Sequence, residues 1–597
     1  MVDQQGSQPP QPDFEKITAN MASVAEKSQR LIAEFMQRQS EGENAGVEDP
    51  LNIGQTFLEL TQKMMADPAK MANAQMALWQ DYLKLWQNAA ERLSGQQTEP
   101  VASPKPDDKR FKHDGWNDNQ LFDFIKQSYL LTSDWMLRTV ADVEGLDEEE
   151  RHKASFFTKQ FADALSPTNF LATNPQVLAA TAESGGENLV KGLDNLLQDL
   201  ERGHGRLAVS QTDMAAFEVG SNVATTPGKV VFQNELFQLL QYTPTTPDVY
   251  ARPLLITPPW INKFYILDLR SDNSFIKWAV DQGLTVFVIS WVNPDRELAD
   301  KSFEDYMTDG LLAAVDAVEA ATGSSEVNAI GYCIGGTLLS STLAYMTAKG
   351  DKRITSATVF ASLVDFADVG DLSVFIDESQ IRSIEESMAE KGYLEGHEMA
   401  TTFNMLRSND LIWSFVINNY MLGKEPFPFD LLYWNSDSTR MPAAMHSFYL
   451  RNMYQHNQLA QPGGVTLAGQ AIDLRTIKTP YYILAAKEDH IAPWKSAFKA
   501  TGLYAGKNKF VLSASGHIAG VINPPAAEKY CYWTNAKKSA DADDWLNGAT
   551  QHEGSWWPDW IKWVGKLSGE KVPARQPGDG KLDVIEDAPG SYVKSKA

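Results

Sequence analysis

The sequence predicts an α/β domain preceded by an all-helical N-terminal region. Two observations predict this arrangement. From about residue 206 onwards, short apolar runs alternate with helical segments, which is typical of a parallel sheet covered by helices on both faces. Over the first two hundred residues, apolar side chains instead recur at helical spacing.

Composition and charge narrow the class of protein. A chain of 597 residues is too long for one ordinary domain, so about two to four folding units are expected. The formal net charge of -24 argues against nucleic acid as a partner, because phosphate backbones are bound by basic surfaces. The two cysteines, Cys333 and Cys531, are too few for a disulfide framework and fit a reducing compartment. Cys531, between two tyrosines, is interpreted as a packing residue.

Targeting and metal-binding patterns are not found in the sequence. The polar first thirteen residues do not read as a signal peptide, and no uncharged apolar run is long enough to span a membrane. We also expect no metal site. The sequence therefore predicts a cytoplasmic protein without a membrane span.

Residues 1–107 are expected to form amphipathic helices followed by a linker. Apolar residues recur at helical spacing over residues 14–39, with charges between them. A second helix carries large apolar side chains along one face, namely Met76, Trp79, Leu83 and Trp86. Either these faces pack against each other and the rest of the protein, or they form an adhesive surface for a hydrophobic partner, because exposed Trp and Met are costly unless covered.

A second helical region is expected over residues 108–205. A polar linker with prolines, ending at about residue 108, leads into it. Its later helices are predicted at residues 169–180 and 187–200. Neither N-terminal region contains a candidate constellation for chemistry.

The α/β domain is expected to cover residues 206–597. Its predicted strands, of which the first two form a hairpin, are residues 230–232, 237–242, 253–257, 284–290, 327–330, 358–361, 481–486 and 510–512. Helices are predicted between them at residues 273–282, 303–322 and 337–346. More than a hundred mostly helical residues, about 364–477, separate the sixth strand from the seventh. We interpret them as a cap inserted over the carboxyl edge of the sheet, where ligands of such folds bind.

Residues 331–335 read G-Y-C-I-G, the pattern of a nucleophile elbow with cysteine in place of the usual serine. A predicted strand enters this pattern and a predicted helix leaves it, so Cys333 is expected at the tip of a sharp turn. Gly331 and Gly335 flank it because a β-carbon at either position would crowd the strand or the helix. A single match of this kind also arises by chance, and a free cysteine is often a small buried hydrophobe. The interpretation therefore depends on residues further along the chain.

Two later loops supply the partners of a nucleophilic cysteine. Asp489 and His517 follow the last two predicted strands. The order nucleophile, acid, histidine, with each residue at a strand end, is that of the α/β-hydrolase fold. Glu488 and His490 are local competitors for these roles. We therefore predict an α/β-hydrolase fold with an inserted helical cap and the catalytic residues Cys333, Asp489 and His517.

Each of these residues has a role in acyl-transfer chemistry. Thiolate is the reactive form of cysteine, so His517 would take the proton from Cys333 while Asp489 fixes the histidine tautomer. A thiol that attacks a thioester exchanges one C–S bond for another, so the acyl-enzyme forms at little free-energy cost and can be handed on. The sequence thus favours acyl transfer from a thioester.

The oxyanion hole is expected from two backbone N–H groups. One is that of Ile334, the residue after the nucleophile, and the other lies in the loop after the strand at residues 253–257. The first two residues after that strand are prolines, which have no N–H. Trp260 or Ile261 would therefore supply the second donor.

Several long motifs resemble those of the polyhydroxyalkanoate synthases. They are G-Y-C-I-G-G at 331–336, P-P-W-I-N-K-F-Y-I-L-D-L at 258–269, S-W-V-N-P-D at 290–295, E-D-H-I-A-P-W at 488–494 and S-G-H-I-A-G-V-I-N-P-P at 515–525. The resemblance extends upstream to D-K-R-F at 108–111 and S-P-T-N-F-L at 166–171, and it covers about residues 108–570. Length and elbow are most similar to the class I, single-subunit type, the poly(3-hydroxybutyrate) polymerases.

The resemblance implies an acyltransferase that joins (R)-3-hydroxyacyl-CoA monomers, such as 3-hydroxybutyryl-CoA, into a polyester and releases CoA. The growing chain would be held as a thioester on Cys333, with His517 as base and Asp489 as its partner. Which of these two activates the monomer hydroxyl stays open. The resemblance also implies no cofactor beyond the CoA thioester substrate, a homodimer, and a place on polymer granules in the cytoplasm, where the N-terminal helices would meet a hydrophobic surface.

One stretch departs from the family pattern. Residues 526–530 read A-A-E-K-Y, where we would look for an arginine that meets a CoA phosphate. Lys529 or Arg407 would serve as this substrate-binding cation, although each also fits an ordinary surface position. So acidic an enzyme still needs local positive charge to hold a polyanionic substrate.

Two other functions are compatible with the same features. An α/β-hydrolase-type esterase or polyhydroxyalkanoate depolymerase would keep the same triad and release free acid instead of polymer. A non-catalytic granule-coating protein would need only the N-terminal helices, and Cys333→Ala would leave its function intact.

Overall fold

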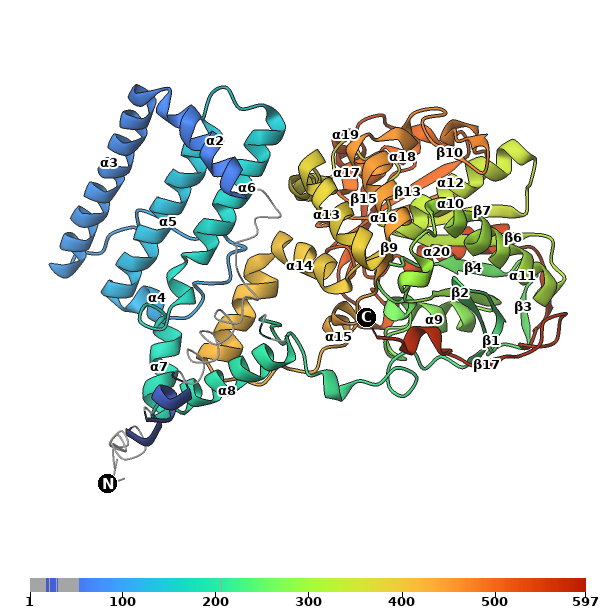
Figure 1. The fold of residues 1–597 in the computed structure, drawn as a ribbon, viewed down its shortest axis with the longest axis horizontal. Helices are drawn as coiled ribbons and strands as arrows, with labels where there is room; N and C mark the ends of the chain where they lie inside the picture. Colours follow the sequence, from blue (N-terminus) through green and yellow to red (C-terminus); the bar gives the residue numbers. More distant parts are fainter. Residues whose placement is uncertain are drawn as a thin grey trace. The chain divides into compact units, whose positions relative to one another are not determined.

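The computed structural model describes residues 18–20, 22–27, 29, 53–203, 205 and 207–596 (Figure 1). The chain forms two compact units. Unit 1 consists of Met1–Asp213 and Arg407–Phe427, and unit 2 consists of Met214–Leu406 and Pro428–Ala597. The amphipathic helix predicted over residues 14–39 lies largely outside the described residues.

Unit 1 is helical, as the sequence predicts. Its helices include α2 Ile53–Met65, α3 Pro68–Leu93, α4 Gly115–Asp118, α5 Gln120–Ala141, α6 Glu148–Ala164, α7 Pro175–Ser184 and α8 Glu187–Arg202. α5 packs against α3, α4 and α6. The helix predicted over residues 169–180 begins later, at Pro175, because the Asn174 side chain caps it and Pro167–Asn169 forms a separate 3-10 turn.

A segment from much later in the sequence completes unit 1. The π-helical segment η8 (Val416–Met421) lies against α8. Gly192 permits this close approach, since a β-carbon there would lie 1.9 Å from the carbonyl oxygen of Tyr420. The Asn188 side chain donates to the carbonyl oxygen of Met421 at 2.8 Å. The segment falls within the stretch predicted as one inserted cap, yet its contacts group it with the N-terminal helices.

The core of unit 2 is an 11-stranded sheet among the described residues. In spatial order its strands are β15 Thr550–Glu553, β14 Cys531–Thr534, β13 Asn508–Ser513, β12 Tyr481–Ala486, β7 Ile354–Phe360, β6 Val327–Tyr332, β4 Leu254–Thr257, β5 Val286–Trp291, β2 Phe237–Tyr242, β1 Gly228–Gln233 and β17 Glu586–Asp587. The neighbours from β13 to β5 are parallel, and the pairs on either side of them are antiparallel. Each predicted run forms one of these strands, whereas β14, β15 and β17 are absent from the prediction.

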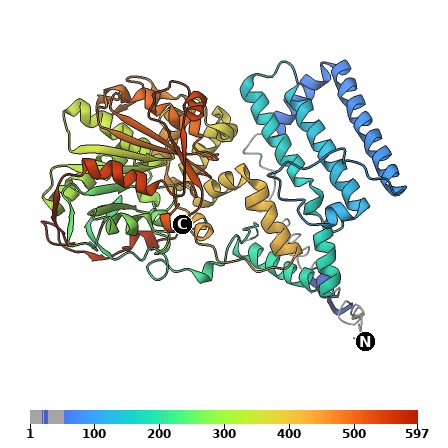
Figure 2. The ribbon, with the colours of Figure 1, turned by 180° about the vertical axis from the view of Figure 1, so that it is seen from behind.

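Helices connect and cover the strands of unit 2. They include α9 Phe275–Asp281, α10 Phe303–Asp305, α11 Ala313–Thr322, α12 Ile334–Lys349, α13 Glu378–Lys391, α14 Gly396–Leu406, α15 Asp430–Ser436, α16 Ala443–Tyr449, α17 Trp494–Phe498, α18 Ala500–Leu503, α19 Ala542–Asn547 and α20 Trp557–Val564. α9 and α20 pack on each other, with the rings of Phe275 and Trp557 5.1 Å apart. Figure 2 shows α20 in front of the strands, whereas Figure 1 shows α12 in front of them from the opposite side. Helices on both faces explain why β4, β6 and β12 are buried along their whole length.

The chain between β7 and β12 is mostly helical and contains α13 to α16. Two short strands within it, β8 Tyr393–Leu394 and β9 Met441–Pro442, pair with each other. α16 continues directly into a π-helical segment, η9 Leu450–Gln455. The predicted boundaries of the cap, and those of the three predicted regions of the chain, stay predictions.

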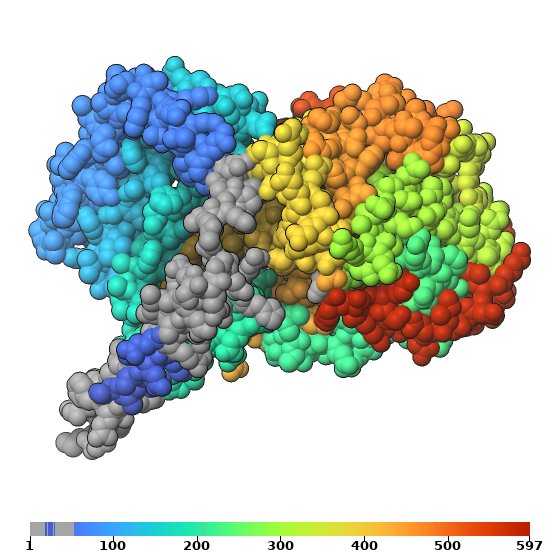
Figure 3. Space-filling model, in the orientation of Figure 1, coloured from blue at the N-terminus to red at the C-terminus, as the bar shows by residue number. Residues whose placement is uncertain are grey.

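The C-terminal segment runs along the outside of unit 2 (red in Figure 3). It is fastened by Val593, which is buried, and by Tyr592, whose hydroxyl donates to the carbonyl oxygen of Asn234 at 2.8 Å. Among the described helices, none combines the length and the apolar character that a membrane crossing needs.

Candidate active site

Cys333 occupies a sharp turn between β6 and α12. The strand ends at Tyr332 and the helix begins at Ile334, so the cysteine alone makes the turn. Its backbone has φ 53° and ψ -124°, a conformation that residues other than glycine rarely adopt. Its N–H donates to the carbonyl oxygen of Phe360 in β7 at 2.9 Å, which holds the strained turn against the sheet. The predicted strand, turn and helix around Cys333 are therefore present.

The two glycines that flank the turn are required by space. A β-carbon on Gly331 would lie 2.5 Å from the Cα of Gly336, at the start of the helix. A β-carbon on Gly335 would lie 2.2 Å from the carbonyl oxygen of Thr257, at the end of β4. Both distances are far below van der Waals contact, so the elbow depends on glycine at each position.

His517 and Asp489 form a buried hydrogen-bonded pair. His517 Nδ1 and Asp489 Oδ2 are 2.7 Å apart, and the two residues are 8% and 7% exposed. The other carboxylate oxygen, Oδ1, accepts the N–H groups of Ile491 and Ala492 at 2.8 and 2.9 Å. These bonds fix the carboxylate in the loop after β12, and the bond from Nδ1 leaves Nε2 of the imidazole for Cys333.

The imidazole is strongly basic in this setting. Burial alone would lower the pKa of His517. The negative charges of Asp489 and Cys333, together with hydrogen bonds to both side chains, outweigh burial and raise the pKa of His517 to about 10. The structure thus brings together the three residues predicted for the triad, each from the end of a different parallel strand.

Tyr332 links the elbow to the histidine loop. Its hydroxyl donates to the carbonyl oxygen of His517 at 3.0 Å, and its ring lies 5.7 Å from the imidazole, centroid to centroid. Tyr332 is fully buried, and burial raises the pKa of its hydroxyl well above the usual value. It is therefore a neutral donor that positions the histidine. Sequence reasoning did not single it out, although it lies inside the elbow motif.

The loop after β4 lies against the beginning of α12, as an oxyanion hole requires. Because the Thr257 carbonyl oxygen leaves no room for a β-carbon on Gly335, the end of β4 and the first turn of α12 lie side by side. Ile334 is the first residue of α12, so its N–H has no acceptor within the helix. Trp260, at the middle of the loop, is buried, and among the described residues its N–H makes no backbone hydrogen bond. These features are compatible with both predicted donors, and Ile261 stays the alternative to Trp260.

Two tyrosines from the inserted helices lie close to Cys333. Tyr449 ends α16 and Tyr454 lies in η9, and their rings are 5.4 Å apart. Burial raises the pKa of both hydroxyls, and the nearby charge of Cys333 contributes to the shift. Sequence reasoning missed these residues because aromatic side chains in an apolar helix usually serve packing.

Glu488, Arg407 and Lys529 are other residues considered for the site from the sequence. Glu488 is exposed, so Asp489 is the acid that reaches the histidine. Arg407 belongs to unit 1, is half-exposed and pairs with Asp410. Lys529 is exposed in the loop before β14. Lys529 contacts neither Cys333 nor His517 within the described part of the chain.

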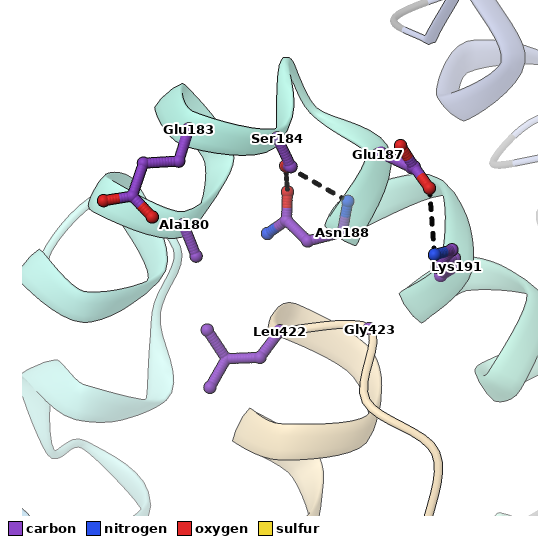
Figure 4. A pocket seen from close by; sticks show the side chains of 8 residues that line it. All are labelled: Ala180, Glu183, Ser184, Glu187, Asn188, Lys191, Leu422 and Gly423. Carbon is purple, nitrogen blue, oxygen red and sulfur yellow. Dashed lines mark hydrogen bonds and ion pairs between the residues drawn. The ribbon is translucent and has the colours of Figure 1, made fainter.

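Unit 1 has a surface pocket whose central polar side chains bond to one another (Figure 4). It is lined by Ala180, Glu183, Ser184, Glu187, Asn188, Lys191, Leu422 and Gly423. Ser184 bonds to Asn188 at 2.9 Å and Glu187 pairs with Lys191 at 2.9 Å, so its central polar groups already satisfy one another. Over the described residues, no three His, Cys, Asp or Glu side chains gather as metal ligands.

The arrangement at Cys333 can perform covalent acyl transfer. A basic imidazole takes the proton of the thiol, and the thiolate is the nucleophile. The buried carboxylate stabilises the imidazolium that results. Backbone N–H groups beside the turn can stabilise the oxyanion of a tetrahedral intermediate.

Comparison with known proteins identifies the relatives of this chain. Residues 107–279 match the family model of the poly-beta-hydroxybutyrate polymerase (PhaC) N-terminus, and residues 271–524 match that of the alpha/beta hydrolase fold. The poly(3-hydroxyalkanoate) polymerase subunit PhaC of Rhizobium meliloti is 51% identical over 98% of this chain and 96% of its own length. The poly(3-hydroxyalkanoate) polymerase of Methylorubrum extorquens is 50% identical over 99% of both chains. The corresponding subunit of Cupriavidus necator is 44% identical over 89% of both.

Proposed function

This chain belongs to the poly(3-hydroxyalkanoate) polymerases, acyltransferases that use an acyl-CoA substrate, and we propose that it builds its polyester through a covalent thioester on Cys333. The family and the α/β-hydrolase fold predicted from the sequence are confirmed. The observation that carries the proposed mechanism is the thiol at the elbow, whose charge acts on an imidazole that Asp489 holds through a 2.7 Å hydrogen bond. We take (R)-3-hydroxybutyryl-CoA as the preferred monomer.

Acylation is the first step. Cys333 passes its proton to His517 and attacks the thioester carbonyl carbon, which forms a new C–S bond. The tetrahedral oxyanion is stabilised by the N–H groups of Ile334 and of Trp260 or Ile261. When the intermediate collapses, the C–S bond to CoA breaks and the imidazolium returns its proton to the leaving thiolate.

Chain growth is the second step. The 3-hydroxyl of a monomer loses its proton to a base and attacks the Cys333 thioester, so that an ester C–O bond forms and the C–S bond to the enzyme breaks. Asp489 already accepts three hydrogen bonds, from His517, Ile491 and Ala492. These three donors already engage both oxygens of the carboxylate, which favours His517 as the base that activates the hydroxyl.

The test uses the purified full chain and (R)-3-hydroxybutyryl-CoA. We expect release of free thiol, an insoluble polymer, and a mass increase of a hydroxybutyryl unit on the peptide that contains Cys333. An esterase or depolymerase would give free 3-hydroxybutyrate without polymer. An adduct on Cys531 and none on Cys333 would contradict the mechanism.

We also propose that the protein works as a homodimer at the surface of polymer granules in the cytoplasm. Support comes from α3, where the apolar stripe predicted from the sequence is exposed: Met76, Trp79, Leu83 and Trp86 are 58%, 64%, 56% and 62% exposed. A face of this kind fits a hydrophobic solid surface. Trp79→Ser should reduce co-sedimentation with polyhydroxybutyrate particles several-fold while leaving thiol release unchanged, and light scattering of the wild type should give twice the chain mass.

For the CoA phosphates we propose Lys529 ahead of Arg407. Arg407 is already paired with Asp410, whereas Lys529 is exposed and makes no ion pair within the described residues. Lys529→Ala should raise KM for the acyl-CoA several-fold with little change in kcat, because a contact to the CoA phosphates is made equally in the ground state and the transition state. An unchanged KM would remove Lys529 from the site.

A further inference from the structure

The loop that follows β4 is tied to the inserted segment by a buried ion pair. Lys263, at the end of this loop, places its ammonium 2.8 Å from Oδ1 of Asp437, which follows α15. The two side chains are only 3% and 1% exposed. Two charges so deeply buried are held together strongly, because breaking the pair would leave an uncompensated charge away from water.

The pair has further partners that complete its hydrogen bonding. Oδ2 of Asp437 accepts the Tyr265 hydroxyl at 2.8 Å. The Lys263 ammonium donates a second bond, at 2.8 Å, to the carbonyl oxygen of Ser595 in the C-terminal segment. Burial lowers the pKa of Lys263, and the opposing charge of Asp437 supports the protonated form. Three parts of unit 2 that are distant in sequence therefore meet at this ammonium.

Other contacts join the same loop to the same inserted segment. The carbonyl oxygen of Lys263 accepts the indole N–H of Trp434 at 2.7 Å. The carbonyl oxygen of Trp260 accepts the Thr439 hydroxyl at 2.6 Å. Asn262 and Ser438 form an isolated antiparallel bridge. The inserted segment thus fixes the loop that contains Trp260 and Ile261, the residues expected to supply an oxyanion donor.

We propose that Lys263 is a positioning residue for the reaction at Cys333: its ion pair with Asp437 holds the loop so that the N–H of Trp260 or Ile261 lies at the oxyanion hole. The inference rests on the proposed function, since it needs an oxyanion to form on an acyl group attacked by Cys333. The ammonium itself touches neither the thiol nor the substrate. It acts through the loop, and a displacement of about 1 Å in such a loop can cost about a hundredfold in rate.

The experiment compares two reactions of the same thiol in Lys263→Met. Acylation by (R)-3-hydroxybutyryl-CoA passes through an oxyanion, whereas alkylation by iodoacetamide displaces iodide and forms none. We expect kcat for thiol release to fall about 10- to 100-fold with KM nearly unchanged. We expect the rate of alkylation at Cys333 to stay within about twofold of the wild type. Equal losses in both reactions, or an unchanged kcat, would overturn the proposal.

A matched control separates positioning from general damage. Lys126 and Asp123 form another buried lysine and aspartate pair, at 2.8 Å with 5% and 7% of the side chains exposed, in unit 1. Lys126→Met removes the same charge by the same substitution, and we expect kcat to stay within about twofold of the wild type. A loss of kcat in Lys126→Met equal to that in Lys263→Met would contradict a specific role.

A second variant covers the case in which Lys263→Met does not fold. Lys263→Met with Asp437→Asn removes both charges, leaves no buried ion without a partner, and keeps an acceptor for Tyr265. We expect this double variant to be soluble, with kcat still reduced about tenfold or more and alkylation intact. Wild-type kcat in the double variant would overturn the proposal. Failure of the proposed function would differ from both results, because the wild type itself would then form no acyl adduct on Cys333.

Discussion

The two cysteines of this chain belong to the same sheet region, Cys333 in the turn after β6 and Cys531 within β14, but their surroundings differ in backbone, partners and charge. Cys333 follows the central parallel strand β6 with a positive φ, and its charge helps to raise the pKa of His517. Cys531 begins the antiparallel strand β14 near the sheet edge and pairs across the strands with Glu553. Burial and the Glu553 charge raise the pKa of the Cys531 thiol. Cys333 is therefore positioned as a nucleophile, whereas the surroundings of Cys531 favour its protonated thiol.

The difference shows what topology contributes to reactivity. The carboxyl ends of β6, β12 and β13 lie along one edge of a parallel sheet, so the thiol, the carboxylate and the imidazole converge without being close in sequence. The antiparallel strand β14, one position from the edge of the sheet, has no such convergence of loops. Cys531 is half-buried, like the rest of β14.

The largest effect is expected when the two cysteines are removed in turn. Cys333→Ala should reduce CoA release to background, about a million-fold below the wild type, because removal of the nucleophile of a triad abolishes its covalent path. Cys531→Ala should stay within about twofold. A thiol-release assay with (R)-3-hydroxybutyryl-CoA measures both variants. Comparable losses in the two would refute the assignment of the elbow.

A smaller loss is expected from the acid of the triad. Asp489→Asn keeps the shape of the side chain but favours the wrong tautomer of His517, which should lower kcat about ten-thousand-fold. Glu488→Gln is the matched control, since its side chain is exposed and adjacent in sequence, and kcat should change less than about twofold. Equal effects of the two substitutions on kcat would mean that Glu488 remains a candidate for the acid that partners His517.

The strained turn itself can be tested by adding a single methyl group. In Gly335→Ala the β-carbon would meet the carbonyl oxygen of Thr257 at 2.2 Å, so the turn must shift. We expect a loss of about a hundredfold in kcat and a destabilisation of about 1 to 3 kcal/mol. Gly502→Ala in α18 meets nothing within 4 Å and should leave both quantities nearly unchanged. Chemical denaturation and steady-state kinetics together distinguish these outcomes.

The sequence predicts the parallel centre of the sheet better than its flanks, for a physical reason. Central strands are buried on both faces, so each appears as a short apolar run that local reading detects. β14 is half-buried throughout and β17 has only two residues, so both depend on partners that no local pattern reveals. Cys333, Asp489 and His517 could be singled out as candidates because each follows a strand of the parallel centre of the sheet.

Long-range contacts account for what the sequence did not reveal about the site. Lys263 and Asp437 are 174 positions apart, and no spacing rule relates them. Tyr449 and Tyr454 lie in an apolar helical segment where packing is the ordinary role of aromatics. The contact of η8 with α8 likewise depends on Gly192, whose lack of a side chain makes room for the backbone of Tyr420.

The pH dependence of the unfolding free energy provides a further test of the difference between the two cysteines. The folded-state pKa of His517 is raised to about 10, above the value of about 6.5 for the unfolded chain. A group of this kind contributes stability that is fully present below about pH 6.5 and is lost as pH rises towards 10. The unfolding free energy of the wild type relative to His517→Gln should therefore fall across this range, by at most about 1.4 kcal/mol per pH unit.

The two cysteine variants then separate the causes of this slope. The charge of Cys333 is one of the terms that raise the pKa of His517, so Cys333→Ala should move the fall in stability to lower pH. Cys531→Ala removes no charge that acts on His517 and should leave the fall where it is in the wild type. Urea denaturation at several pH values between 6.5 and 10 measures each curve. Superimposable curves for Cys333→Ala and Cys531→Ala would mean that the Cys333 thiol and the His517 imidazole do not interact electrostatically. The two cysteines would then differ in backbone conformation but not in their electrostatic effect on His517.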